Sequence, residues 1–145
     1  HTQLVLLSFS VPRRQRLLRF RFFLGGQNNL RFGWKQIAPW FLDSTIMSID
    51  EFAQFVRMLD DCEHGIVDKN FSATSSYFVM DENDRLIGAT SLRHYLTVEG
   101  FLSWGHIGYG VRPTERQKGY AVQMLKMMLE QAKKKGIYVH NRLTS

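Results

Sequence analysis

Cysteine and long apolar runs are both scarce in this sequence, and each shortage excludes a class of protein. The one cysteine, Cys62, has no partner for an internal disulfide, and no ligand spacing typical of a metal site surrounds it. We therefore expect no bound metal and a reducing compartment, the cytoplasm. The apolar stretch at residues 4–11 is too short to span a bilayer. It also precedes the arginines, which is the wrong order for a secretory signal, so we expect no membrane partner.

Acidic residues are absent from the start of the chain. Residues 1–42 contain seven Lys and Arg residues and neither Asp nor Glu, whereas the remainder contains twelve basic and thirteen acidic residues. The net charge of +6 therefore belongs to the N-terminal segment, and the rest of the chain is nearly neutral. Residues 1–34 fit a structural strand, a basic arm that binds nucleic acid, an organellar transit peptide or a shifted reading frame.

Length and composition indicate one domain. The 145 residues are 44% apolar and 22% charged, which is ordinary for a globular chain long enough to bury a core. Residues 1–145 are therefore expected to form a single domain with an atypical basic segment at residues 1–34. Ser48 and Glu51 form a capping box, which predicts a helix whose solvated end includes Glu63. The strands expected after that helix lie at residues 76–80, 85–96, 101–111 and 137–140.

A second helix is predicted directly after a short basic turn. The turn is Arg112–Gly119 and the helix is Tyr120–Ala132, with lysines at its carboxyl end and a glycine to stop it. Apolar side chains recur there at helical spacing, which predicts a core-facing stripe. Its members are Ala121, Leu125, Met128 and Ala132, with Val122 and Leu129 beside them.

The start of this helix has the features of an anion site. The first turn of a helix leaves backbone N–H groups without partners, and these point back at the preceding turn. Together with the helix dipole they attract anions, and Gly119 allows a phosphate to approach the backbone closely. Arg116 and Lys118 add positive charge beside it. A basic glycine turn of this kind also occurs as a plain connection between a strand and a helix.

The residues of the turn match a known signature. Arg116-Gln117-Lys118-Gly119-Tyr120-Ala121 resembles the R/Q-x-x-G-x-G/A motif with which the GNAT superfamily of N-acetyltransferases binds the pyrophosphate of acyl-CoA. The wider run GHIGYGVRPTERQKGYA is similar to uncharacterised bacterial members, and the resemblance covers roughly residues 35–137. It implies an α/β (α+β) fold in which helices flank a mixed, mostly antiparallel sheet, apparently truncated after the fifth strand.

The resemblance also implies a reaction and a set of binding residues. Acetyl-CoA would be the co-substrate, and its acetyl group would pass to a primary amine of a small molecule or peptide. The pantetheine arm would pair with backbone groups of Tyr109, Gly110 and Val111. The phosphates would meet the residues of the signature, which are Arg116, Gln117, Lys118, Gly119, Tyr120 and Ala121.

The chain departs from the family pattern at two places. Some members carry a glutamate base on the strand before the turn, but Gly105 stands at that position here. His106 and Tyr109 are the candidate catalytic residues that remain, although alternation along the strand turns His106 to the opposite face from Gly105. Complete members continue through a further helix and two strands, so we expect a second copy to complete the sheet as a homodimer.

Three functions follow from these observations. The first is an N-acetyltransferase, and the second is an acyl-CoA-binding protein that lacks part of the catalytic machinery. The third is nucleic-acid binding through the basic start, which the nearly neutral body of the chain does not favour. No stretch of the sequence identifies the acceptor amine.

Overall fold

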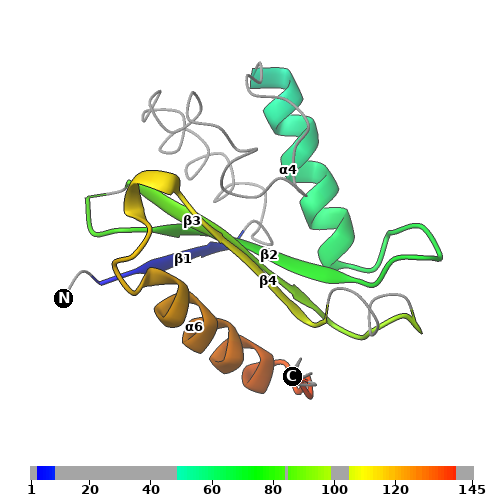
Figure 1. Cartoon of the computed structure of the whole chain (residues 1–145). Coiled ribbons are helices and arrows are strands. Elements are labelled where there is room, and N and C mark those ends of the chain that lie inside the picture. The colour runs from blue at the N-terminus through cyan, green and yellow to red at the C-terminus, as the bar shows by residue number, and fades with distance from the viewer. Residues whose placement is uncertain (1–2, 9–48, 84, 99–104, 140–145) are drawn as a thin grey trace.

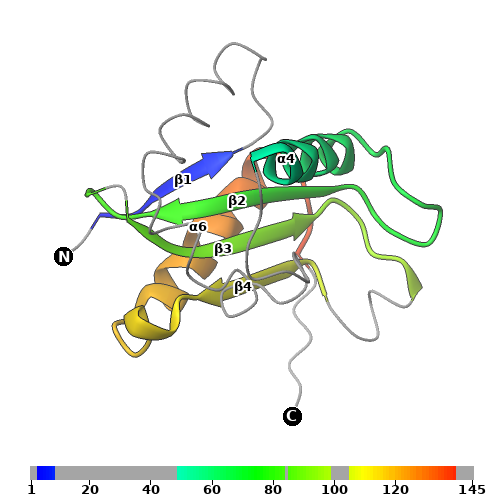
Figure 2. The ribbon, with the colours of Figure 1, turned by 90° about the horizontal axis from the view of Figure 1, so that it is seen from above.

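The computed structural model describes residues 3–8, 49–83, 85–98 and 105–139 of the chain. In these ranges four antiparallel strands form one sheet, in the order β1-β2-β3-β4. Helix α4 covers one face of this sheet and helix α6 the other, as Figures 1 and 2 show. The elements are β1 (Val5–Ser8), α4 (Ile49–Glu63), β2 (Thr74–Met80), β3 (Leu86–Arg93), β4 (Ile107–Val111), the 3-10 helix η1 (Pro113–Glu115) and α6 (Tyr120–Lys134). The expected α/β class, with helices flanking an antiparallel sheet, is confirmed.

The central strands are buried on both faces because a helix covers each face. Every residue of β2 after Thr74 is buried, and so is every residue of β3 before Arg93. On the α6 side the core forms two clusters, each joining strand residues to helix residues. The first contains Leu4, Val79, Ile87, Val111, Tyr120 and Met124, and the second contains Tyr77, Leu92, Met128 and Ala132. Full burial of each large side chain contributes about 1.5–3 kcal/mol.

Helix α6 packs with a different face from the one predicted. Its buried residues are Tyr120, Met124, Met128 and Ala132. Two members of the predicted stripe, Met128 and Ala132, are therefore correct, and Ala121 is half-buried against the core, but Leu125 is 36% exposed. Val122 and Leu129 are also exposed. The spacing of apolar residues fits either face, and contact with β3 and β4 selects the one that buries Tyr120 against Val111.

Residues 137–139 do not form the predicted parallel strand. They have no strand conformation, and His140 lies outside the described residues. The amide of Ile137 instead donates to the Ala132 carbonyl at 2.9 Å, which ends the helix. Ile137 and Val139 still pack on the second core cluster. Among the described residues, no strand pairs with the outer edge of β4.

Several other predictions concern residues outside the described ranges. These are the cap residue Ser48, the start of the strand predicted at residues 101–111, up to residue 104, and residues 9–34 of the basic segment. The predicted first strand is confirmed in its described part, which is β1 (Val5–Ser8).

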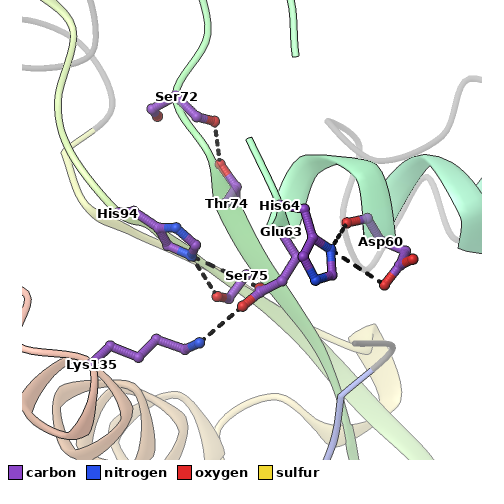
Figure 3. A network of polar contacts seen from close by, with 8 residues as sticks. All are labelled: Asp60, Glu63, His64, Ser72, Thr74, Ser75, His94 and Lys135. Atoms are coloured by element: carbon purple, nitrogen blue, oxygen red, sulfur yellow. Dashed lines mark hydrogen bonds and ion pairs between the residues drawn. The ribbon is translucent and has the colours of Figure 1, made fainter. Parts of the chain in front are cut away.

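A polar cluster ties the ends of the two helices together across the sheet (Figure 3). Lys135, just after α6, binds Glu63 at the end of α4, with 2.9 Å between Nζ and Oε1. Ser75 of β2 lies 2.7 Å from Nε2 of His94, which in turn lies 3.9 Å from Glu63 Oε2. Glu63 is therefore not the solvated residue that the sequence predicts, because Lys135 is brought to it by the fold. We call Glu63, Ser75, His94 and Lys135 the helix-end cluster.

The pKa shifts in the helix-end cluster have opposing causes. Burial raises the pKa of Glu63, but hydrogen bonds from Ser75 and Lys135 outweigh it, so the pKa lies below its ordinary value. Burial lowers the pKa of His94, although the Glu63 charge acts against it. The hydrogen bond to Glu63 raises the pKa of Lys135. A neutral histidine and an ionised pair are therefore the native charge states near neutral pH.

Gly88 allows β4 to lie close to β3. A side-chain carbon built on Gly88 would overlap the carbonyl oxygen of Gly110 and would lie 2.9 Å from Cε of Met124. This oxygen belongs to the backbone of a paired strand, so it cannot move away without breaking the β3–β4 ladder. The position of β4 therefore requires glycine at residue 88.

We predict that Gly88→Ala destabilises the protein by about 1–3 kcal/mol, the usual cost of overpacking a filled site. The extra methyl group must displace either β4 or Met124. Urea unfolding followed by circular dichroism measures the change. Glu82→Ala, an exposed change in the β2–β3 turn, is the control and should stay within about 0.5 kcal/mol of the wild type. Equal stability of the two variants would contradict the close approach.

A second prediction concerns the pH dependence of stability. The pKa of Glu63 is lower in the folded protein than in the unfolded chain. The ionised carboxylate therefore stabilises the fold above the ordinary pKa of a glutamate, and this stabilisation is lost as the pH falls through the pKa of the folded protein. Glu63→Gln should therefore cost about 1 kcal/mol at pH ~7, discounted because Lys135 is partly exposed, and much less at pH ~3. The pKa of His94 is also lowered, so protonation of His94 at acidic pH should destabilise both the wild type and the Glu63→Gln variant.

Thermal melts of the wild type and Glu63→Gln across this pH range test the prediction. Asp61→Asn, which changes an exposed acid of the same helix, is the control and should give no pH-dependent difference. A gap between wild type and Glu63→Gln that stays constant with pH would show that the carboxylate contributes nothing through its charge.

Candidate functional site

Strand β4 presents alternate backbone groups to its free edge. Arg93 N donates to His106 O and Arg112 N donates to Ile87 O, both at 2.8 Å. In an antiparallel ladder every second residue bonds to the neighbouring strand. Continuing this alternation from both ends, Gly108 and Gly110 bond to β3. The N–H and C=O groups of residues 107, 109 and 111 therefore point to the outer edge.

This alternation in hydrogen bonding separates the three residues that were expected to meet a pantetheine arm. Tyr109 and Val111 direct their backbone groups to the free edge, whereas those of Gly110 point into the sheet. Gly110 lies opposite Ala89, and the alternation directs its backbone groups to that residue, so the pairing of Gly110 with the arm stays a prediction. The Val111 carbonyl accepts a hydrogen bond from Nε of Arg116 at 3.0 Å.

Between β4 and α6 the chain makes a turn with two left-handed residues. Gln117 has φ of 61° and Gly119 has φ of 81°, while Arg116 is extended. Helix α6 begins at Tyr120, and no side chain caps its N-terminus. The first-turn N–H groups therefore point at the turn without a side-chain acceptor. Left-handed residues before a helix also produce the concave arrangement of amides that binds anions.

The charges around the turn are organised by a buried acid. Glu115 binds Lys118 at 2.8 Å and Arg85 at 2.9 Å. The hydrogen bond from Lys118 holds the pKa of Glu115 below its ordinary value, with the charges of Arg85 and Arg112 acting in the same direction. Lys118 therefore forms an ion pair with Glu115, a contact that was not predicted from the sequence. Arg116 is exposed beside it.

The remaining residues of the turn divide between surface and core. Gln117 and Gly119 are exposed, so their backbone is open to solvent. Tyr120 is 9% exposed and packs with Val111, which joins the helix start to the end of β4. Ala121 is half-buried against the same cluster. The structure thus brings the residues of the predicted signature together next to the free edge of β4 (Figure 1).

A cleft of about 930 Å³ lies between the end of α4, the following loop and strands β2–β4. One wall is largely apolar and comes from α4 and the loop. The other wall is the sheet, where small polar residues gather. The described lining residues are Met58, Leu59, Cys62, Ile66, Val67, Asp68, Asn70, Phe71, Ser72, Thr74, Ser76, Ser91, Arg93, Thr97, Ile107, Gly108 and Tyr109. Apart from Tyr109, none of them was identified as a site residue from the sequence.

The cleft floor is built from facing pairs on neighbouring strands. Ser76 lies opposite Ser91, and Gly108 lies opposite Ser91 on the other side. Ser91 is 3% exposed, and its Oγ has no hydrogen-bond partner in the part of the chain that the structure describes. Thr74 and Arg93 form the next facing pair. Nη1 of Arg93 donates to the Gly105 carbonyl at 3.0 Å, and burial lowers the pKa of this arginine.

The two candidate catalytic residues lie in different environments. Tyr109 is 44% exposed and lines the cleft beside the free edge of β4. His106 is 8% exposed and is not among the lining residues, and its carbonyl accepts from the Arg93 amide. Cys62 also lines the cleft, where burial and the Asp61 charge raise the pKa of its thiol. A protonated thiol agrees with a packing role for Cys62.

The described residues contain neither a cluster of metal ligands nor a helix that could cross a membrane. No group of three or more His, Cys, Asp or Glu side chains there is arranged to hold a metal ion. None of the helices in those ranges is long and apolar enough to cross a membrane.

Comparison with known proteins gives a family match. The profile of the Acetyltransferase (GNAT) family matches residues 34–144. No curated protein matches the chain. A solved spermidine N-acetyltransferase from Vibrio cholerae, in complex with CoA and spermine, is 20% identical with a TM-score of 0.45. The match covers 90% of this chain and 63% of that one. A spermidine/spermine N-acetyltransferase from Vibrio cholerae, in complex with manganese ions, is 19% identical with a TM-score of 0.43, covering 90% and 61%.

The left-handed backbone at Gln117 gives a prediction for the turn. A β-branched residue tolerates positive φ poorly, so Gln117→Val should be about 1–2 kcal/mol less stable than Gln117→Gly. The side chain is exposed, so burial does not account for a difference between the two variants. Chemical denaturation of both variants measures this gap. Equal stabilities would mean that the turn is not held in the left-handed region.

Proposed function

Because this chain belongs to the acetyltransferase (GNAT) family, we propose that it transfers an acetyl group from acetyl-CoA to a primary amine. The observation that carries the proposal is the uncapped start of α6, placed directly beside the free edge of β4. The chain spans 63% of the length of the first similar solved structure, so the activity of the whole protein is part of the proposal.

The turn has the chemistry that a diphosphate requires. Amides at the start of α6 offer donors, and each hydrogen bond to a charged oxygen contributes roughly 1.5–3 kcal/mol. The left-handed Gly119 has no heavy atom within 4 Å of where a side chain would begin, which leaves room for a phosphate against the backbone. Arg116 and Lys118 supply positive charge, although Lys118 is shared with Glu115. These residues, with Gln117, would hold the diphosphate of coenzyme A.

The free edge of β4 suits the amide-containing arm of the same molecule. Tyr109 offers both its N–H and its C=O there, and Val111 offers its N–H. An extended arm with amide groups can pair with these as an additional strand would. The edge continues into the cleft at Gly108 and Tyr109, so an acetyl group at the end of the arm would face the acceptor.

Acetyl-CoA would supply the activated acetyl group, and the chain would position the amine and stabilise charge. A backbone N–H of the open edge near Val111 that the arm leaves unbound is the donor we assign to the developing oxyanion. The amine must be neutral to attack. As its nitrogen bonds to the acetyl carbon, the bond from that carbon to the sulfur of coenzyme A breaks; the proton of the amine passes to a base or to water, and the leaving thiolate takes up a proton. Tyr109, which lines the cleft at the edge of β4, and His106, which is buried opposite Arg93, are our candidates for proton transfer.

The test is the binding of CoA. Acetyl-CoA at one hundred times its dissociation constant should stabilise the protein by about 2.7 kcal/mol, seen as a raised melting temperature. Arg116→Ala should weaken CoA binding about tenfold, since it removes one charged contact. Lys126→Ala removes an exposed charge from the same helix and should leave binding unchanged. An unchanged melting temperature with excess acetyl-CoA would overturn the proposal.

Turnover is tested separately from binding. Release of free thiol from acetyl-CoA in the presence of a primary amine is expected for the enzyme. Binding of CoA without thiol release for any amine would identify an acyl-CoA-binding protein that lacks catalysis.

A further inference from the structure

Two buried hydroxyl groups of β3 have no hydrogen-bond partner among the described residues, and they face opposite sides of the sheet. They belong to Thr90 and Ser91, which are 0% and 3% exposed. Thr90 lies between Gly88 and Leu92 on the face that α6 covers, because side chains alternate along a strand. Ser91 points the other way and lines the cleft. A molecule in the cleft can therefore supply the partner that the Ser91 hydroxyl lacks, whereas Thr90 is enclosed in the core.

Gly108 leaves the way open from Ser91 to the free edge of β4. It lies opposite Ser91 and has no side chain, so β4 places no side chain directly beside the hydroxyl. The Cα atoms of such a hydrogen-bonded pair are about 5.5 Å apart. The proposed path of the pantetheine arm follows this same edge, so the hydroxyl lies about one strand spacing from the place where the acetyl group would be attacked. Ser91 is therefore positioned to bind the attacking nitrogen.

The wall opposite Ser91 exposes large apolar side chains to the cleft. Met58 is 47% exposed, Ile66 is 66% exposed and Phe71 is 58% exposed, and all three line the cleft. They come from α4 and the loop after it, and the buried Leu59 continues the same wall. A group of exposed apolar side chains marks a binding surface, because covering them removes apolar area from water. The wall therefore suits a ligand with an apolar body.

Carboxylates are scarce in the cleft. Among the described lining residues Asp68 is the one carboxylate, and it is exposed in the loop, where its Oδ1 accepts from the Asn70 amide at 3.4 Å. A second ammonium group that packed on the apolar wall would lose water, and this exposed acid is the one carboxylate there to replace it. A single amine needs no such partner, because it must be neutral to attack. The lining therefore favours a monoamine over a polyamine.

We propose that the acceptor is a primary monoamine with an apolar body, held at its nitrogen by the Ser91 hydroxyl and along its chain by the apolar wall. An N–H of the neutral amine donates to Ser91 Oγ, so the nitrogen lone pair stays available for the acetyl carbon. The chain packs against Met58, Ile66 and Phe71. This inference rests on the proposed function and specifies its acceptor class, in which Ser91 positions the amine.

Three amines test the class of acceptor. They are hexylamine, butylamine and hexamethylenediamine, and each is titrated calorimetrically into the whole chain saturated with CoA at pH ~9, where a larger share of the amine is neutral. Hexylamine should bind about tenfold more tightly than butylamine, which lacks two methylene groups. Hexamethylenediamine should bind about tenfold more weakly than hexylamine, because its second ammonium group must lose water against the wall.

Two variants that each delete one hydroxyl group locate the nitrogen. Ser91→Ala should weaken hexylamine binding about fivefold, the usual contribution of one hydrogen bond. It should not lower the melting temperature of the free protein, since the hydroxyl that it removes has no partner there. Thr90→Val removes the other unpartnered hydroxyl and should leave the affinity for hexylamine unchanged. A serine that served the fold alone would give the reverse result, a lower melting temperature with an unchanged affinity.

Phe71→Ala tests the apolar wall separately. The side chain is exposed, so the variant should fold as the wild type does, and hexylamine should bind about fivefold more weakly. Leu129→Ala removes an exposed apolar side chain of α6 that lies outside the cleft, and it should leave the affinity unchanged.

The outcomes separate this inference from the proposed function. The inference is overturned if the diamine binds as tightly as hexylamine, if Ser91→Ala or Phe71→Ala keeps the wild-type affinity, if Ser91→Ala fails to fold, or if no amine binds. Failure of CoA to bind would overturn the proposed function instead. The three amines are then titrated against the protein without CoA, with the same order of affinities expected.

Discussion

The structure depends on a strand that is hydrogen-bonded along one side and open along the other. Strand β4 uses Gly108 and Gly110 to bind β3, and this leaves the groups of Tyr109 and Val111 directed outward. Because the same strand ends at the turn into α6, its open backbone and the uncapped helix start lie next to each other. Gly88 makes this arrangement possible, since any side chain there would push β4 away. The β3–β4 ladder thus positions both the free edge of β4 and the turn that leads into α6.

Features that depend on neighbours in sequence were predicted well. The turn from Arg116 to Gly119 and the helix after it could be identified because a glycine, a helix start and basic residues act over a few positions. The strands at residues 74–80 and 86–93 follow from apolar runs bounded by polar turns.

Features that depend on distant residues were missed. Glu63 was assigned to a solvated helix end because its partner Lys135 is far along the chain. The predicted buried face of α6 differs from the observed one by about one residue, because contact with β3 and β4 decides which face is buried. Which residues of β4 direct their backbone groups outward depends on the alternation of hydrogen bonding, which no local pattern shows. The cleft floor had one readable signal, the polar residues within otherwise apolar strands, namely Thr74, Ser76, Ser91 and Arg93. Their facing registers became evident only with the strands paired.

The helix-end cluster also connects the two faces of the sheet. Glu63 closes the helix that walls the cleft, and Lys135 follows the helix whose other end forms the turn. A displacement of one helix end therefore changes the geometry of a contact made by the other. If a molecule in the cleft shifts α4 and so changes the affinity of the turn for its ligand, a molecule at the turn changes the affinity of the cleft by the same factor, because the coupling of two binding sites is reciprocal. A single carboxylate–ammonium contact would then couple the two ligands in addition to any direct contact between them.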